Sequence, residues 1–263
     1  MISIIISTHN PTFLQSVSQN IKETIGVEYE IIAIENHKQY SLCAAYNLGS
    51  DRAKYQYLCF LHEDVVFITH DWGVRLIALM TNDSSIGLIG IAGSKFKSTY
   101  PTTGWGAGPF IYKFWRGHYY ININENRTYV DIDRSLQKKE VEDVLIVDGV
   151  FLFSKREVLL SCRFDDKSLT HFHGYDTDFS LQVYFQSYRV IVDRGLELFH
   201  YSSGVIGDEF EKANRKILNK WLHKLPVATK DCHLNNIQLQ YYDILTWVGY
   251  LWFAFKRKLQ HKK

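Results

Sequence analysis

The sequence predicts an α/β protein built around a mostly parallel β-sheet flanked by helices, and three observations lead to this prediction. Apolar runs of strand length alternate with segments in which apolar residues recur at helical spacing. The connections between these segments are only a few residues long, as in right-handed βαβ units. Each of the first three apolar runs ends in a polar cluster. Because the carboxyl ends of parallel strands share one edge of a sheet, we expect these clusters to converge.

The alternation is clearest in residues 1–93. We expect strands at residues 2–7, 30–34 and 57–61, and helices at 13–25, 42–53 and 72–80. Ser41 is a candidate N-cap, because a hydroxyl just before a helical segment can bind the first free amides. The run at residues 86–92 is broken by glycines, which indicates bends or close backbone approach in a strand.

The second half of the chain has a less regular pattern. Residues 95–142 carry many tyrosines and short alternating segments, and we interpret them as hairpins and loops inserted over the sheet edge. After them we expect strands at 144–153, 189–192 and 197–200, a helix at 175–186, and mainly helical structure from residue 207. We therefore expect one domain over residues 1–206, divided into halves 1–93 and 94–206, and a helical C-terminal extension over 207–263.

The composition excludes several protein classes. The chain has 263 residues and 46% hydrophobic content, enough for a sizeable core, and its formal net charge of +2 argues against nucleic-acid binding through a basic surface. Four widely separated cysteines form no zinc-type spacing, which argues against a disulfide framework and favours a reducing compartment. The first residues lack the basic region of a signal peptide, and no segment reaches the roughly 18 to 20 apolar residues of a membrane span. We therefore expect a cytoplasmic protein.

The third predicted strand ends in His62, Glu63 and Asp64, three consecutive residues that can ligate a metal or accept hydrogen bonds. Carboxylates and an imidazole at a strand end can hold a hard divalent cation, and through it a diphosphate. For these residues alone, a charged surface loop is the alternative. The first two strands also end at polar residues, which are Thr8, Asn10, Glu35 and Asn36. This expected convergence favours a ligand site.

Asp176 and Asp178 stand at the start of the helix predicted for residues 175–186. A carboxylate there can cap the helix or balance its dipole, and this structural role stays open for each residue. Positions two apart on a helix do not face each other, so we expect the two carboxylates to differ in role. In the functional interpretation, one takes up the proton of a substrate hydroxyl as a general base. His200, at the end of a short apolar run, is either structural or a metal ligand beside Asp64.

Sequence motifs for other kinds of active site are absent. The chain contains no GxxxxGK[ST] or GxGxxG phosphate loop, no GxSxG elbow and no HExxH helix. Because so few backbone amides are arranged for anion binding, a metal-dependent diphosphate site is the more economical interpretation.

The order of these features resembles family 2 glycosyltransferases, nucleotide-sugar enzymes with the Rossmann-like GT-A fold, over residues 2–204. Thr8 and Asn10 match the end of the first strand, where these enzymes begin their nucleotide pocket. Glu35 falls where they place an acidic residue against the base, and Asn47 lies in a helix of small residues similar to theirs. The resemblance implies that these four side chains contact the nucleotide sugar, in a half-domain that spans residues 1–93.

The segment around Asp64 resembles the strand that bears the DxD motif of this family. The resemblance implies that Asp64 and His200 hold Mn²⁺ or Mg²⁺, and that His62 and Glu63 contact the nucleotide sugar. The chain departs from the pattern here, because His62 stands where the family has the first Asp of DxD.

Residues 175–179 resemble the family's ED-x-D motif, in the acceptor half that spans 94–206. The resemblance implies that Asp176 is the catalytic base and that Asp178 assists at the acceptor hydroxyl. Tyr175 replaces the Glu of this motif, and Ser187 replaces the Gly that precedes an aromatic and basic pair.

Together these matches imply a metal-dependent inverting glycosyltransferase. Its donor would be a nucleoside-diphosphate sugar, with UDP expected from its prevalence in the family, and its acceptor a hydroxyl of a glycan or of a lipid-linked substrate. A nucleotidyltransferase that makes nucleotide sugars is one alternative, although it should carry a glycine-rich basic loop where residues 8–11 stand. A non-catalytic carbohydrate-binding relative is the other, because His62 and Tyr175 depart from the motifs.

The last residues suggest a membrane contact. Residues 241–255 are rich in aromatic side chains and lead into Lys256-Arg257-Lys258 and His261-Lys262-Lys263. An aromatic and basic helix of this kind can lie on an anionic membrane surface, which here would be the inner face of the membrane. A helix docked on the core with a solvated basic end is the alternative.

Overall fold

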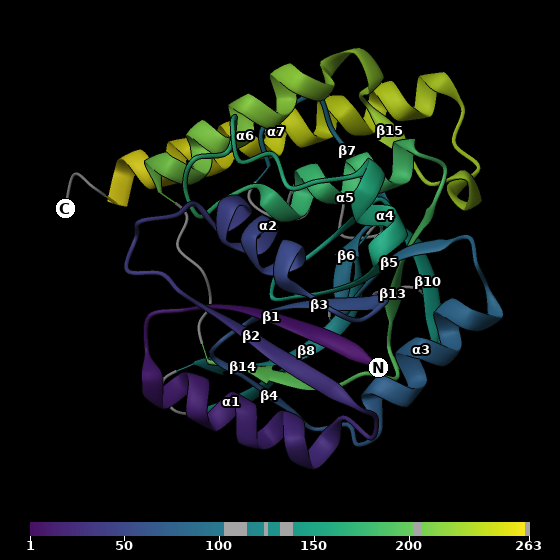
Figure 1. The fold of residues 1–263 in the computed structure, drawn as a ribbon. Coiled ribbons are helices and arrows are strands. Elements are labelled where there is room, and N and C mark those ends of the chain that lie inside the picture. Colours follow the sequence, from purple (N-terminus) through teal and green to yellow (C-terminus); the bar gives the residue numbers. More distant parts are fainter. Residues whose placement is uncertain (103–114, 124–125, 132–138, 202–206, 261–263) are drawn as a thin grey trace.

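A mixed seven-stranded sheet forms the centre of the molecule and confirms the α/β prediction. The computed structural model describes residues 1–102, 115–123, 126–131, 139–201 and 207–260. The strands of this sheet are β1 (Ile2–Thr8), β2 (Tyr29–Glu35), β3 (Tyr57–His62), β5 (Ile86–Gly90), β10 (Val141–Val144), β12 (Phe151–Lys155) and β13 (Arg189–Asp193). Their order across the sheet is β10-β13-β5-β12-β3-β1-β2 (Figure 1).

The first three strands lie parallel, as the short βαβ connections predict. β1 pairs with β2 on one side and with β3 on the other, and β5 pairs in parallel with β13. β12 runs antiparallel between β3 and β5, and β10 is antiparallel to β13, which makes the sheet mixed. The register sets Thr8 opposite Glu35 and Ser7 opposite His62. The carboxyl ends of these strands therefore meet at one edge, as expected.

A second sheet lies beside this edge. Its strands are β4 (Val65–Phe67), β6 (Ala92–Ser94), β8 (Trp115–Ile123), β11 (Ile146–Val147) and β14 (Leu198–His200), in the order β11-β6-β8-β14-β4. β9 (Asn126–Asp131) pairs with β8 and forms the hairpin expected within residues 95–142, although residues 103–114 with their glycines fall outside the described part of the chain. The antiparallel pairing of β14 with β4 sets His200 opposite Val65, next to the end of β3.

Helices cover both faces of the central sheet. They are α1 (Pro11–Thr24), α2 (Leu42–Arg52), α3 (Trp72–Asn82), α4 (Arg156–Ser161), α5 (Tyr175–Phe185) and α6 (Asp208–Trp221), whereas α7 (Asn236–Gln260) packs on Phe96. The Ser41 hydroxyl accepts a hydrogen bond from the Ala44 amide at 3.1 Å, which confirms the predicted cap of α2. Asn10 caps α1 through hydrogen bonds from the amides of Thr12 and Phe13.

The two faces of the sheet bury two separate apolar clusters. Alternate residues of β1 divide between them, so that Ile5 packs with α2, α5 and α6, whereas Ile4 packs with α1 and α3. Both clusters consist of fully or almost fully buried side chains. Trp221 on α6 belongs to the first cluster, so this helix is part of the same core as the sheet.

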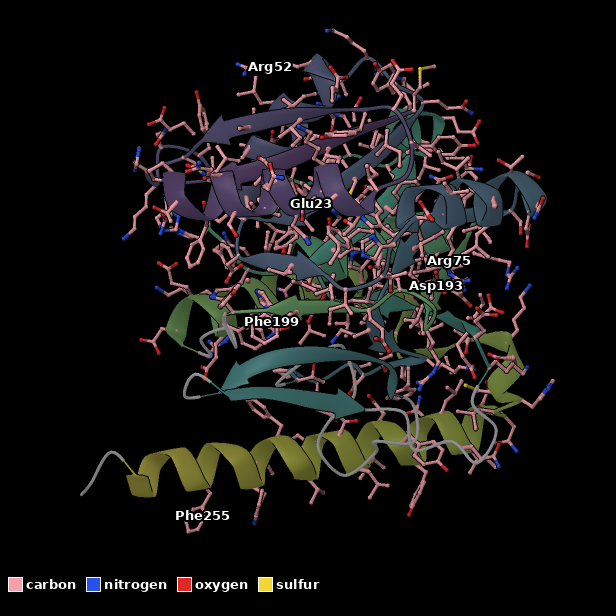
Figure 2. All side chains as sticks on the ribbon, turned by 90° about the horizontal axis from the view of Figure 1, so that it is seen from below. Glu23, Arg52, Arg75, Asp193, Phe199 and Phe255 are labelled. Carbon is pink, nitrogen blue, oxygen red and sulfur yellow. The ribbon has the colours of Figure 1, made fainter. Side chains whose placement is uncertain are left out.

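Arg75 of α3 ties the second helical face to the end of β13. Its guanidinium donates two hydrogen bonds of 2.7 Å to the buried carboxylate of Asp193 (Figure 2). A Cβ atom at Gly195 would lie 2.3 Å from the guanidinium carbon. A larger residue there would displace the guanidinium from its present position.

One face of α7 is anchored on the segment that begins with the short strand β7 (Phe96–Lys97), and β7 pairs with β15 (Val227–Ala228). The buried carboxylate of Asp243 accepts hydrogen bonds from the Ser98 hydroxyl at 2.5 Å and from the Thr99 amide at 2.8 Å. Phe96 packs against Leu239, Tyr242 and Leu245 of this helix. Among the described residues, no helix has the length and apolarity that a bilayer crossing requires.

Candidate active site

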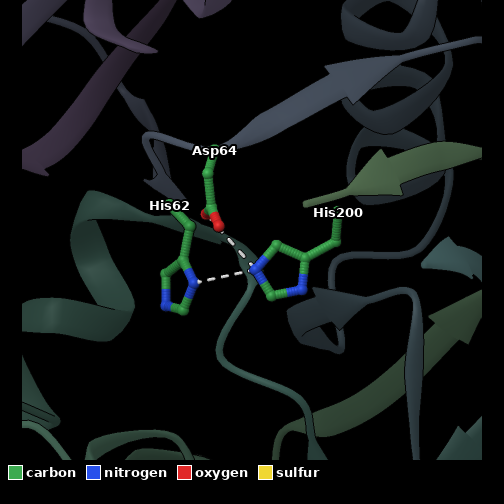
Figure 3. A group of neighbouring side chains, drawn as sticks. All are labelled: His62, Asp64 and His200. Atoms are coloured by element: carbon green, nitrogen blue, oxygen red, sulfur yellow. Dashed lines mark hydrogen bonds and ion pairs between the residues drawn. The ribbon is translucent and has the colours of Figure 1, made fainter. Parts of the chain in front are cut away.

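Three side chains at the carboxyl end of β3 form a candidate metal centre (Figure 3). The Nε2 atom of His200 lies 3.3 Å from Oδ1 of Asp64 and 3.5 Å from Nδ1 of His62. One potential ligand atom from each residue lies within 4.8 Å of the others. A mixed set of two imidazoles and one carboxylate suits a first-row divalent cation such as Mn²⁺ better than it suits Mg²⁺, which prefers oxygen ligands. The donor set therefore fits the divalent cation expected from the sequence.

The backbone fixes the positions of these three residues. His62 ends β3, and a tight turn through Glu63 leads Asp64 into β4. The pairing of β4 with β14 brings His200 alongside, and the Tyr201 amide donates a hydrogen bond of 3.0 Å to the Asp64 carbonyl. Residues 138 positions apart are thus held in one cluster by sheet hydrogen bonds.

Tyr175, at the start of α5, is hydrogen-bonded to the second ring nitrogen of His62. Its hydroxyl lies 2.8 Å from Nε2 of His62, and its ring is buried. A Cβ at Gly149 would lie 2.1 Å from this hydroxyl, so only glycine leaves room for the contact. Burial, followed by the nearby His200, lowers the pKa of His62 to about 4. Since metals bind neutral imidazole, this environment favours the ligating form.

Asp176 lies next to Tyr175, near a second carboxylate. The amides of Thr177 and Gly149 hydrogen-bond to the Asp176 carboxylate, the first at 2.7 Å. Burial, together with the negative charge of Asp148, raises the pKa of Asp176 to about 7. Asp148 also interacts electrostatically with His62, so the carboxylate pair and the candidate metal centre adjoin. A carboxylate with a pKa near neutrality can take up a proton from a substrate hydroxyl.

Asp178 has contacts of a different kind. Its carboxylate, 1% exposed, accepts hydrogen bonds from the Trp221 indole at 2.8 Å, from Lys220 at 2.9 Å and from Gln182 at 2.8 Å. Two of these donors belong to α6. Asp178 therefore links α5 to α6, and its described contacts do not include the residues of the candidate metal centre.

Glu63 is directed toward the loop after β1. Its buried carboxylate accepts hydrogen bonds from the Thr8 hydroxyl, from the His9 amide at 3.2 Å and from the Asn10 amide at 3.1 Å. It also lies 2.8 Å from Nδ1 of His9. Glu63 thus brings the first and third strand ends together, and Thr8 and Asn10 are engaged in that loop.

The two remaining predicted residues lie apart from this cluster. Glu35 ends β2 next to Thr8, with an exposed carboxylate 3.0 Å from Nε2 of His37. Asn47 is buried in α2, where its amide nitrogen donates to the Phe164 carbonyl at 2.9 Å and to Asp166 at 3.0 Å. The structure therefore brings Thr8, Asn10, Glu63, Asp64, His62, His200 and Asp176 to one edge, with Glu35 at its border and Asn47 on the helical face.

Sequence reasoning did not assign a site role to Tyr175 or Asp148. The only signal for Tyr175 is its position directly before Asp176, where the family motif has Glu. For Asp148 the signal is a dipeptide with Gly149 that interrupts an apolar run. Neither signal indicates which side chain Tyr175 or Asp148 contacts. Such contacts are long-range in the sequence, since Tyr175 and His62 are 113 positions apart.

Comparisons with known proteins identify the family and the fold of the chain. A family model described as "Glycosyltransferase like family" matches residues 3–221. The fold is similar to that of a crystal structure of GalNAc-T7 with UDP, GalNAc and Mn²⁺, with a TM-score of 0.55, 13% identity and coverage of 77% of this chain and 44% of that one. The chain thus spans less than half the length of that protein, and the similarity concerns the fold alone.

A structure of A197 from STIV is also similar over 77% of this chain and 86% of that one, at 16% identity, but its TM-score of 0.41 supports no conclusion. No curated protein sequence matches the chain. The family match covers far more than half of the residues, and the GT-A fold of the model agrees with it. The chain belongs to the glycosyltransferase-like family.

Proposed function

We propose that this chain is a metal-dependent inverting glycosyltransferase, which moves a sugar from a nucleoside-diphosphate sugar to a hydroxyl of a glycan or lipid-linked acceptor. The observation that carries the proposal is the cluster of His62, Asp64 and His200 beside a carboxylate with a pKa near 7. A metal centre next to a general base is the combination that this transfer needs.

The donor would bind at the edge where β1, β2 and β3 end. His62, Asp64 and His200 would hold Mn²⁺ or Mg²⁺ there. When bound, the cation neutralises the charge of the departing diphosphate. UDP is the proposed nucleotide, supported by family prevalence and by the UDP and Mn²⁺ of the GalNAc-T7 structure. Thr8, Asn10 and Glu35 would contribute the nucleotide side of the pocket, with Glu63 supporting the loop.

Asp176 would act on the acceptor. Its carboxylate takes the proton from the acceptor hydroxyl as that oxygen attacks the anomeric carbon, and the bond to the diphosphate breaks on the opposite side. The amides of Thr177 and Gly149 fix the orientation of this carboxylate. We do not assign proton transfer to Asp178, because its carboxylate oxygens accept hydrogen bonds from Trp221, Lys220 and Gln182.

The two departures from the family motifs are in contact with each other. His62, in place of an Asp, and Tyr175, in place of a Glu, meet at 2.8 Å. For Nδ1 of His62 to ligate a metal, Nε2 must carry the proton, and this N–H then donates a hydrogen bond to the Tyr175 hydroxyl. The tyrosine therefore positions the histidine, and the paired replacement supports an altered but intact metal site rather than a decayed one.

The test is a panel of nucleotide sugars incubated with the purified full chain and Mn²⁺, with release of nucleoside diphosphate as the readout. We expect release with at least one UDP-sugar and a metal-dependent rise in melting temperature. Asp64→Asn should abolish both, whereas the matched control Asp51→Asn, on an exposed carboxylate paired with Arg163, should keep both. Failure across the panel together with no thermal response to metal would favour the non-catalytic alternative.

A further inference from the structure

Helix α7 presents a continuous apolar stripe to solvent. The residues of this stripe are between 43% exposed, for Trp247, and 81% exposed, for Ile237. The stripe, named here the α7 stripe, consists of Ile237, Tyr241, Ile244, Val248, Leu251 and Phe255, with Trp247 and Trp252 at its sides. The spacing of four, three, four, three and four residues keeps these side chains on one face over about 27 Å of helix.

The opposite face of α7 is already occupied. Leu239, Tyr242 and Leu245 pack on Phe96, and Asp243 is hydrogen-bonded to Ser98 and Thr99. Figure 2 shows α7 along one edge of the molecule, with Phe255 directed away from the other elements. A helix that is apolar on both faces is normally covered on both. The exposed side chains of the α7 stripe therefore form an apolar surface that is suited to docking.

The charges around the stripe identify the partner. Asp243 is the only acidic residue in the sequence 236–260, and its carboxylate is buried. The sequence then continues with Lys256-Arg257-Lys258 and His261-Lys262-Lys263. In Figure 1 the C-terminal end of α7 extends past the body of the molecule, on the side where β1 and β2 end. In the sequence, the apolar face of α7 is thus followed directly by a basic segment.

We propose that the α7 stripe docks on the surface of an anionic lipid bilayer, with the helix lying in the plane of the interface. Aliphatic side chains of the stripe enter the acyl boundary, and the rings of Tyr241, Trp247 and Trp252 sit at the headgroup level. The basic segment is attracted by anionic headgroups. A second copy is the less suitable occupant, because paired helices use opposite charges beside the apolar seam and α7 exposes no acidic one. This contact does not depend on the proposed glycosyl transfer.

The experiment is flotation of the full chain with vesicles of phosphatidylcholine alone or with added phosphatidylglycerol. We expect binding to the anionic vesicles, weakened by high salt, and a loss of about tenfold or more in the double variant Ile244→Glu/Leu251→Glu. The matched control is Leu160→Glu on α4, where the leucine is 83% exposed and lies on a different element. It should bind vesicles like the wild type.

Circular dichroism and light scattering accompany each variant, and Ile244→Gln/Leu251→Gln replaces the charged pair if that pair does not fold. Absence of wild-type flotation with anionic vesicles would overturn the proposal, as would equal flotation of the double variant. A wild-type dimer that the double variant dissociates, without any flotation, would identify a second copy as the occupant and also overturn it. Nucleoside diphosphate release is scored separately, so failure of either proposal is recognised independently.

Discussion

Two acidic segments meet at the candidate active site, and each divides its carboxylates between two roles. In the turn after β3, Glu63 is bonded to the loop of Thr8, while Asp64 joins two histidines. At the start of α5, Asp178 is bonded to α6, while Asp176 lies next to Asp148. In each pair one carboxylate is fixed by several donors within the protein. The other carboxylate of each pair, Asp64 or Asp176, has its contacts at the sheet edge and is the one suited to metal binding or proton transfer.

The division between Asp176 and Asp178 predicts the largest functional difference. Asp176→Asn removes the proposed base but keeps the size of the side chain, so we expect kcat to fall by about 10³-fold with KM for the donor nearly unchanged. The measurement is steady-state nucleoside diphosphate release, with folding checked by thermal melting. Activity close to wild type would contradict the comparison, because Asp176 would then not be the base.

Asp178→Ala should produce the opposite result, a loss of stability. It leaves the buried Trp221 indole without an acceptor and removes one of the two carboxylates around Lys220, so we expect a cost of about 3 kcal/mol in the free energy of unfolding. Urea unfolding gives the measurement. The folded fraction should keep its metal response, and a variant as stable as wild type but inactive would instead return Asp178 to the catalytic site.

The elements around the site could be predicted from sequence because local patterns determine them. The β-branched run before Thr8 and the cap at Ser41 are local signals, and both elements formed as expected. Convergence of the strand ends followed from the parallel pairing of β1, β2 and β3. The pairing of Asp64 with His200 is a hypothesis from their places at strand ends, to which the resemblance adds, and in the structure the two side chains lie 3.3 Å apart.

What the sequence did not reveal depends on long-range side-chain direction. The amide nitrogen of Asn47 donates a hydrogen bond to the carbonyl of Phe164, a residue 117 positions away, and no local pattern indicates this contact. Glu63 and Asp64 are adjacent, and no local pattern indicates which of them turns toward Thr8. The packed fold decides this, because the hydrogen bond from the Thr8 hydroxyl to Glu63 joins residues 55 positions apart.

Tyr175→Phe tests the contact between the start of α5 and the end of β3, where Tyr175 meets His62. The phenylalanine keeps the buried ring but removes the acceptor for Nε2–H of His62, so we expect Mn²⁺ affinity to fall by about 10- to 100-fold. Titration of metal-dependent melting temperature measures this change, and excess Mn²⁺ should restore activity. An unchanged affinity would show that His62 is not held as a ligand, and that Asp64 and His200 bind metal without it.

Asp148→Asn tests the interaction inside the carboxylate pair and has the smallest expected effect. Burial and the charge of Asp148 raise the pKa of Asp176 from 3.8 to about 7, so the proposed base loses its proton only as pH rises through neutrality. Removing the charge of Asp148 should lower this pKa and move the acidic limb of kcat/KM by about one pH unit toward lower pH.

The same shift has a consequence for stability. Between pH 4 and 7 the folded chain keeps the Asp176 proton that the unfolded chain has already lost, so this group lowers the free energy of unfolding as pH rises through that window. Asp148→Asn should reduce that decline, as measured by urea unfolding across the same pH values. A shift in the kinetic limb without the matching change in stability would mean that another group, and not Asp176, sets the pH dependence of the reaction.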